Sequence, residues 1–196
     1  MVVFLKPLIL LYGYNVTTTH RINLRELNMK SGLLKKGEGA DKMPKAIIDK
    51  LMDFCQFNGE QIAELWYKAL STNPKTASFH KMSKEGCIRH ALTMYKNMEH
   101  MFFSEDCNKA VEHVLDVGSF VEDFYARGIP VEEVVYALIL MRRHIWLYAD
   151  IQALFDLNVN DMYNAVNSIN RILLVFDYAT FITARKYREL TTKTGK

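Results

Sequence analysis

The sequence predicts an all-α protein. From Pro44 onward the apolar residues recur at spacings of three and four, the period at which a helix buries one face. No stretch alternates apolar and polar residues with the period of two expected of a half-buried strand. The 196 residues, 49% of them hydrophobic, suffice for one domain with a substantial core. We therefore expect a poorly ordered leader at 1–43, a helical domain at 44–190 and a tail at 191–196.

The first helical segment is expected from about Pro44 to Leu70. Asn58 and Gly59 interrupt it, since glycine costs about 1 kcal/mol relative to alanine in a helix interior. They either kink one helix or separate two short ones. Residues 71–82 are expected to form a connector.

The next two helices are predicted from their capping residues. Ser83 is suited to the N-cap of a helix that ends near Phe103, and Ser104 to the N-cap of the third helix. Gly118 lies on the apolar stripe of this third helix and predicts a close helix crossing. Gly128 ends the helix, because glycine takes the left-handed C-terminal conformation without strain.

The fourth helix is expected from Pro130 to about Phe155, because proline suits the first position of a helix. Its apolar residues lie on nearly every side, so it needs cover on two faces. The last helix is expected to begin after an N-cap at Asn158 or Asn160 and to reach about Tyr187. The total is five to six helices, and a terminal helix that outruns its neighbours is suited to pairing with its copy in a dimer.

The charge is distributed unevenly. The leader holds seven basic and three acidic residues, a net charge of +4, whereas the remainder holds 18 basic and 19 acidic residues. A nearly neutral body lacks the basic face that follows phosphates, so we expect no nucleic-acid partner.

The cysteines and the apolar segments indicate the compartment. The cysteines, three in number, include no C-x-x-C pair, which favours a reducing compartment and a cytoplasmic location. The apolar run that follows Lys6 and Pro7 is far shorter than the roughly 20 residues that span a bilayer, so we expect no membrane association.

Three segments resemble a known family. They are IAELWYKAL, FYARGIPVEEVVYALILMRRHIW and FDYATFITARKYREL, within a match that covers roughly residues 44–190. The pattern is similar to the RsbRD N-terminal domain, the sensory half of RsbT co-antagonist proteins in stressosomes and of some bacterial histidine kinases.

The resemblance implies a globin-like, haem-free helical bundle. It also implies a homodimer in a bacterial stress-response or signal-transduction system, which passes a signal through its C-terminal helix to a partner signalling protein. Family members continue into a STAS or kinase module, which this sequence does not include. The function expected from the resemblance is a non-enzymatic sensor domain.

No catalytic motif is present in the sequence. It lacks a Gly-x-Ser-x-Gly nucleophile turn, a phosphate-binding glycine loop and the H-E-x-x-H zinc motif, so we expect no enzyme. Cys87 and His90 have the spacing of one zinc-ligand pair, but a structural zinc site usually requires a second pair. A buried cysteine beside a surface histidine is the simpler interpretation, and no metal is expected. A helical enzyme or metal protein is one rival reading.

The histidines raise the question of haem. His113 points away from the stripe of its helix, toward solvent, whereas His90 and His144 flank their stripes and are candidate pocket residues. A haem- or tetrapyrrole-binding globin-like sensor that uses His90 or His144 is therefore the alternative function. Tyr95 and Tyr148, on the apolar stripes, complete the pocket candidates together with Arg142. No cofactor is otherwise expected.

Arg142 and Arg143 interrupt the apolar fourth helix. Arg142 lies near its buried stripe and Arg143 opposite, so we expect the first to be partly buried and the second exposed. A partly buried arginine requires an anion. That anion is either a bound ligand or, more simply, an internal carboxylate such as Asp123 or Asp177.

The outer face of the fourth helix is the candidate dimer interface. Val135, Ile139 and Trp146 lie away from its main buried stripe. They form either a surface for a second copy or a second layer of core against the first helix.

Overall fold

The structure is a computed structural model that describes residues 47–151 and 159–195. The chain divides into two units, Met1–Lys42 and Met43–Lys196. The first unit, and with it the predicted leader, lies outside the described residues. Within the second unit all the regular structure that is described is helical, which confirms the all-α prediction.

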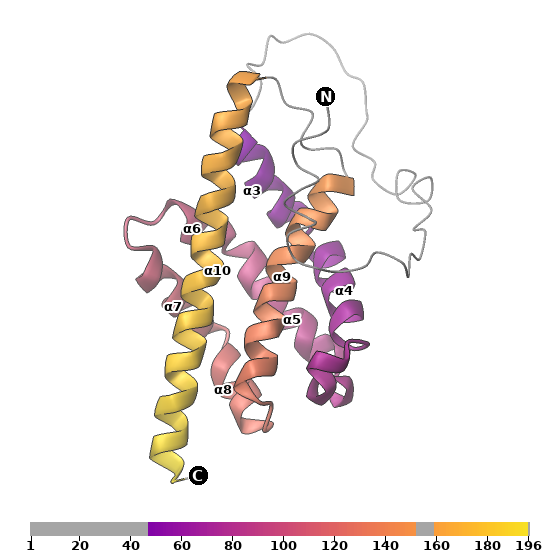
Figure 1. Ribbon diagram of the computed structural model, residues 1–196, viewed down its shortest axis with the longest axis vertical. Helices are drawn as coiled ribbons and strands as arrows, with labels where there is room; N and C mark the ends of the chain where they lie inside the picture. Colours follow the sequence, from indigo (N-terminus) through magenta and orange to yellow (C-terminus); the bar gives the residue numbers. More distant parts are fainter. Residues whose placement is uncertain (1–46, 152–158, 196) are drawn as a thin grey trace. The chain divides into compact units, whose positions relative to one another are not determined.

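Figure 1 shows how the described helices are arranged. None of the described helices is long and apolar enough to span a bilayer. In chain order they are α3 (Ile47–Phe57), α4 (Gly59–Leu70), the 3₁₀ helix η1 (Pro74–Lys81), α5 (Lys84–Lys96), α6 (Met98–Phe103), α7 (Cys107–Val117), α8 (Phe120–Ala126), α9 (Val131–Ile151) and α10 (Val159–Thr194).

Several predicted boundaries are confirmed. The interruption near Asn58 separates α3 from α4, and the side chain of Ser83 accepts a hydrogen bond from the backbone N–H of Gly86 at the start of α5. Gly128 has a φ of 71°, in the left-handed region, and α9 begins directly after Pro130. These signals are local, so the residue types alone locate the helix ends.

Other boundaries were wrong. The expected helix from Ser83 to Phe103 is divided at Asn97 into α5 and α6. Ser104 is the C-cap of α6; Asp106 caps α7, accepting a hydrogen bond from the N–H of Lys109 at 3.0 Å. A carboxylate suits this position because it also interacts favourably with the positive end of the helix dipole.

The third predicted helix is also divided. Gly118 ends α7, and Ser119 takes a φ of 49° before α8 begins. The close crossing predicted at Gly118 is confirmed, since a Cβ there would lie 3.1 Å from Cγ2 of Thr93 on α5. The last helix extends past its expected end at Tyr187, to Thr194. Of its two predicted caps, Asn160 lies inside α10 and Asn158 lies outside the described residues.

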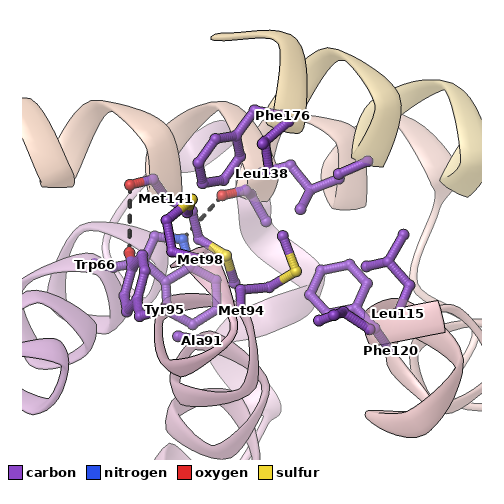
Figure 2. Close-up of a cluster of buried hydrophobic side chains, with 14 of the residues drawn as sticks. Trp66, Ala91, Met94, Tyr95, Met98, Leu115, Phe120, Leu138, Met141 and Phe176 are labelled. Atoms are coloured by element: carbon purple, nitrogen blue, oxygen red, sulfur yellow. Dashed lines mark hydrogen bonds between the residues drawn. The ribbon is translucent and has the colours of Figure 1, made fainter. Parts of the chain in front are cut away.

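The core is built around α9. Trp66 on α4 donates its indole N–H to the carbonyl of Ala137 at 2.9 Å, and Tyr95 on α5 donates its hydroxyl to the carbonyl of Met141 at 3.3 Å. Figure 2 shows both bonds among the packed side chains. α9 also packs against α3, η1 and α10, so the predicted cover on more than one face is confirmed.

α10 packs along the other helices of the bundle. It contacts α3 and each helix from α6 to α9, and Figure 1 shows it as the long yellow ribbon. Its buried stripe recurs at three and four residues and comprises Ile172, Val175, Phe176, Ala179, Ile182, Thr183 and Tyr187.

Candidate functional site

The five predicted pocket residues have separate protein partners. Tyr95 bonds the Met141 carbonyl, as described above. Tyr148 packs its ring 5.2 Å from that of Phe54, and its hydroxyl lies 3.5 Å from Oδ1 of Asn58. Burial raises the pKa of both tyrosines, most strongly that of Tyr95. Both tyrosines therefore have structural explanations within the core.

His144 is buried on α9. Its Nδ1 lies 2.7 Å from the carbonyl oxygen of Leu140, one turn earlier, and so donates to it when it carries the proton. Burial lowers the pKa of the ring, which the Leu140 carbonyl partly offsets. The ring is therefore favoured as neutral, with Nε2 as its acceptor nitrogen.

Arg142 forms the internal ion pair expected from the sequence. Its Nη1 lies 3.2 Å from Oδ1 of Asp177 on α10, and the two side chains are 19% and 66% exposed. Its positive charge is thus met by a carboxylate of the same chain. Arg143 is half-buried and has interactions of its own, so the prediction that it is exposed was wrong.

His90 lies at the contact of α5 with α8. Only 2% of its side chain is exposed, and Nε2 lies 3.3 Å from Oδ2 of Asp123. Its ring centroid is 4.9 Å from that of Phe124 and 5.6 Å from that of Phe120. The interpretation of His90 as a surface histidine was therefore wrong, because α8 covers the side of α5 on which it lies.

Burial and the neighbouring charges both shift the pKa of His90. Desolvation lowers the pKa of the ring, Asp123 raises it, and Arg89 and Arg127 lower it. The backbone of Gly118 also raises the pKa. The buried Nδ1 of the ring has no hydrogen-bond partner of normal geometry. The net effect is a lowered pKa, so the packed ring is favoured as neutral.

The metal and haem readings depend on the same side chains. Over the parts of the chain that are described, no three His, Cys, Asp or Glu side chains lie close enough to hold a metal ion. Cys87 is buried near His90, and burial raises its thiol pKa to about 11. His113 is exposed, as predicted. Ligation by His90 through Nε2 would displace the contact with Asp123.

The candidate dimer residues differ in exposure. Ile139 is 38% exposed, while Val135 and Trp146 are half-buried and Trp146 packs against the core. They are therefore covered partly, but not wholly, within one chain.

α10 continues this surface. Arg142 lies opposite Asp177, and Tyr187 donates its hydroxyl to the carbonyl of Ile129, so α9 and α10 run antiparallel. This register places Ile139 level with the turn of α10 that carries Phe181, which is 57% exposed. We call the outer face of the two helices the α9–α10 face. Its apolar members are Val135, Ile139, Trp146, Val166, Leu173, Leu174 and Phe181.

The sequence contained signals for residues that we missed. Leu174 and Phe181 are seven residues apart on the exposed side of α10, a spacing that indicates one face.

Arg185 and Lys186 on α10 bind carboxylates of α7 and α8. Arg185 pairs with Glu112 at 2.5 Å, and Lys186 pairs with Asp116 and lies 3.8 Å from Glu122.

No protein-family model, curated protein or solved structure matches this chain. The resemblance to the RsbRD N-terminal domain therefore stays a prediction.

Proposed function

We propose that this chain is a non-enzymatic sensory and dimerisation domain that relays a signal through α10. The observation that carries the proposal is the two-sided character of α10. One side of its 36 residues packs against five helices of the bundle, and the other presents apolar residues outward. A change in any of these helices can therefore reach a partner bound to the outer side.

The length of α10 suits this role. At 1.5 Å per residue, the helix is about 54 Å long. Arg171, in the N-terminal half of α10, donates to the carbonyl of Phe102 on α6, and Lys186, near its C-terminus, lies 3.8 Å from Glu122 on α8. Displacement at one contact can therefore reach the other. Its buried stripe fixes it to the core, so it reports on the packing of the domain.

The α9–α10 face is the proposed dimer interface. Phe181 and Ile139 are large apolar side chains exposed on neighbouring helices, with the Arg142–Asp177 pair one turn further along both helices. An apolar centre with polar groups at its edge is typical of an interface between protein subunits. Two helices from each copy would form a four-helix contact by two-fold symmetry.

A non-enzymatic role agrees with the state of the titratable groups. The histidines, tyrosines and cysteines with shifted pKa values are those that the core has desolvated. A catalytic site would instead bring such groups together in a cleft around a reacting atom. Among the described residues, these buried groups lie at several helix contacts, with Cys55 near Tyr95 and Cys87 near His90.

The resemblance supplies the finer part of the proposal. On that basis we propose a globin-like arrangement of the bundle, a cytoplasmic location in bacteria and a signalling protein as the downstream partner. The three segments that resemble the RsbRD domain fall on α4, on α8 and α9, and on α10, the elements that form the core and the proposed interface.

The alternative function is binding of haem or a related tetrapyrrole. One observation favours it, since donation from Nδ1 of His144 to a backbone carbonyl leaves Nε2 as the lone-pair nitrogen that metals bind. Expression with haem supplementation tests it. A Soret band that disappears in a His144→Gln variant would establish this function in place of a haem-free sensor.

The dimer is tested by light scattering and sedimentation at micromolar to high micromolar concentration. We expect the wild type to be a dimer and Phe181→Glu to be a monomer, because the substitution places charge within the apolar face. Phe103→Glu is the matched control, since Phe103 is 56% exposed but lies on α6. Circular dichroism verifies that each variant is folded. A wild-type monomer at high micromolar concentration, or equal dimerisation by Phe181→Glu, contradicts the proposal.

A further inference from the structure

α8 is a short helix between two residues in the left-handed region. Ser119 precedes it with a φ of 49°, and Gly128 follows it with a φ of 71°. Non-glycine residues rarely adopt such a conformation, and the Ser119 side chain makes no capping hydrogen bond that would favour it. The position of α8 therefore depends on the contacts of its own side chains.

One side of α8 holds the ring of His90. Phe120 and Phe124 pack against the ring, and the carboxylate of Asp123 lies 3.3 Å from Nε2. These three residues span both turns of α8, although Phe124 also packs 5.1 Å from Phe79 and Asp123 also pairs with Arg89 at 3.3 Å.

The other side of α8 contacts the C-terminal part of α10. Tyr125 packs its ring 5.4 Å from that of Tyr187, and its hydroxyl lies 2.8 Å from the hydroxyl of Thr194. Glu122 lies 3.8 Å from Nζ of Lys186. A helix of seven residues thus connects a buried histidine to the last turns of the longest described helix.

The charges around His90 affect how readily its ring is protonated as the pH falls. Asp123 on α8 favours the protonated ring, whereas Arg89 on α5 and Arg127 after α8 oppose it, and α7 contributes the backbone of Gly118. Burial is the largest effect and disfavours the charged ring. The charged groups that act on the ring thus lie on α5 and on or directly after α8.

We propose that His90 and α8 form a proton-sensitive latch, in which mild acid releases α8 from α5 and thereby loosens the C-terminal turns of α10. The released state leaves the imidazole in water, where protonation carries no burial penalty. The packed state favours the neutral ring, because the ring is buried and its Nδ1 has no hydrogen-bond partner of normal geometry. The inference rests on the proposed role of α10 as the output helix.

Linkage gives the direction and the limit of the effect. The pKa of the packed ring lies below the ordinary value of 6.5, so the released state binds more protons. The released population therefore rises as the pH falls through about 6.5, and it stops rising below the pKa of the packed ring. For one proton, the increase is at most about tenfold per pH unit.

Hydrogen exchange with mass spectrometry at pH 7.5 and 5.5, corrected for the intrinsic pH dependence of exchange, tests the latch. In the wild type we expect peptides that cover α8 and residues 185–194 to lose protection together at the lower pH. In His90→Gln, which keeps a donor toward Asp123 but cannot titrate, this loss should disappear. His113→Gln removes an exposed histidine on α7, and His144→Gln a buried one on α9. Both should behave as the wild type.

Three results would overturn the proposal. The first is the same pH-dependent loss of exchange protection in His90→Gln, and the second is no loss of protection in the wild type. The third is a loss of protection in α8 while residues 185–194 stay protected. If His90→Gln does not fold, nuclear magnetic resonance of the wild type decides. The His90 ring and the α8 amides should then titrate together, and titration of His90 without a change in α8 contradicts the latch. Light scattering of the same samples reports dimerisation separately, so failure of the dimer and failure of the latch are distinguishable.

Discussion

The two left-handed residues that flank α8 allow a paired test of the backbone. Ser119 is exposed, and its side chain does not cap the helix. Replacing it with glycine removes a conformational cost of about 1–2 kcal/mol. Glycine is also more flexible in the unfolded chain, which returns roughly 0.5–1 kcal/mol. We therefore expect Ser119→Gly to raise the free energy of unfolding by about 0.5–1 kcal/mol.

Gly128→Ala is the opposite substitution, because it replaces glycine with a side-chain residue at the other left-handed position. A Cβ at Gly128 meets no atom within 4 Å, so the effect of the substitution comes from its φ of 71° and not from a clash. The same two effects predict that this substitution lowers the free energy of unfolding by about 0.5–1 kcal/mol. Urea titration followed by circular dichroism measures the free energy of unfolding of both variants, and thermal unfolding should show a Tm change of roughly 1–4 °C in each direction. If Ser119→Gly is neutral while Gly128→Ala is destabilising, Ser119 does not take the left-handed conformation and the account of α8 fails.

Three further predictions concern the core and the surface. Trp66→Phe should lower the free energy of unfolding by about 2–3 kcal/mol in urea titration, because it removes the bond to Ala137 and leaves a cavity. Arg142→Ala should lower it by less than about 1 kcal/mol, since Asp177 is mostly in water; a larger loss would mean that the pair is buried. Cys55, whose pKa burial raises to about 12, should resist a thiol reagent at pH 8 in the folded protein and react at once in urea.

The sequence identified those helix ends whose cause is local. Ser83 caps α5 with its own side chain, and Gly128 ends α8 because its backbone tolerates a positive φ. Pro130 precedes α9 for the same kind of reason. Each effect acts within a few residues, so the residue type is sufficient evidence.

The breaks that the sequence did not predict depend on distant contacts. Ser119 has no intrinsic preference for the left-handed region. It adopts that conformation where α8 turns to place Phe120 and Phe124 against His90, a residue about thirty positions earlier in the chain. Helical periodicity indicates which face a residue is on but not which helix covers that face. This is also why His90 was expected at the surface.

The site residues divide in the same way. That Arg142 has a carboxylate partner follows from the cost of burying an unpaired charge, and Asp177 was one of the acids considered. The pairing of Arg185 with Glu112 joins α10 to α7, and no local pattern indicates that these helices are neighbours. Tertiary arrangement was therefore needed to find the ionic contacts of α10.

The two parts of α10 are held by different interactions, and this difference makes a local release feasible. Its middle part buries Ile172, Val175 and Phe176 in the core. Detaching this part would cost about 25 cal/mol of free energy for each Å² of apolar surface that it exposes. Toward the C-terminus, Lys186 is 14% exposed and binds carboxylates that are about half exposed, while Tyr187 is still buried and packs against Tyr125. Residues 191–195 are exposed. The exposed turn that follows the buried Tyr187 can therefore separate from α8 at small cost while the rest of α10 stays packed, which is the behaviour an output helix requires.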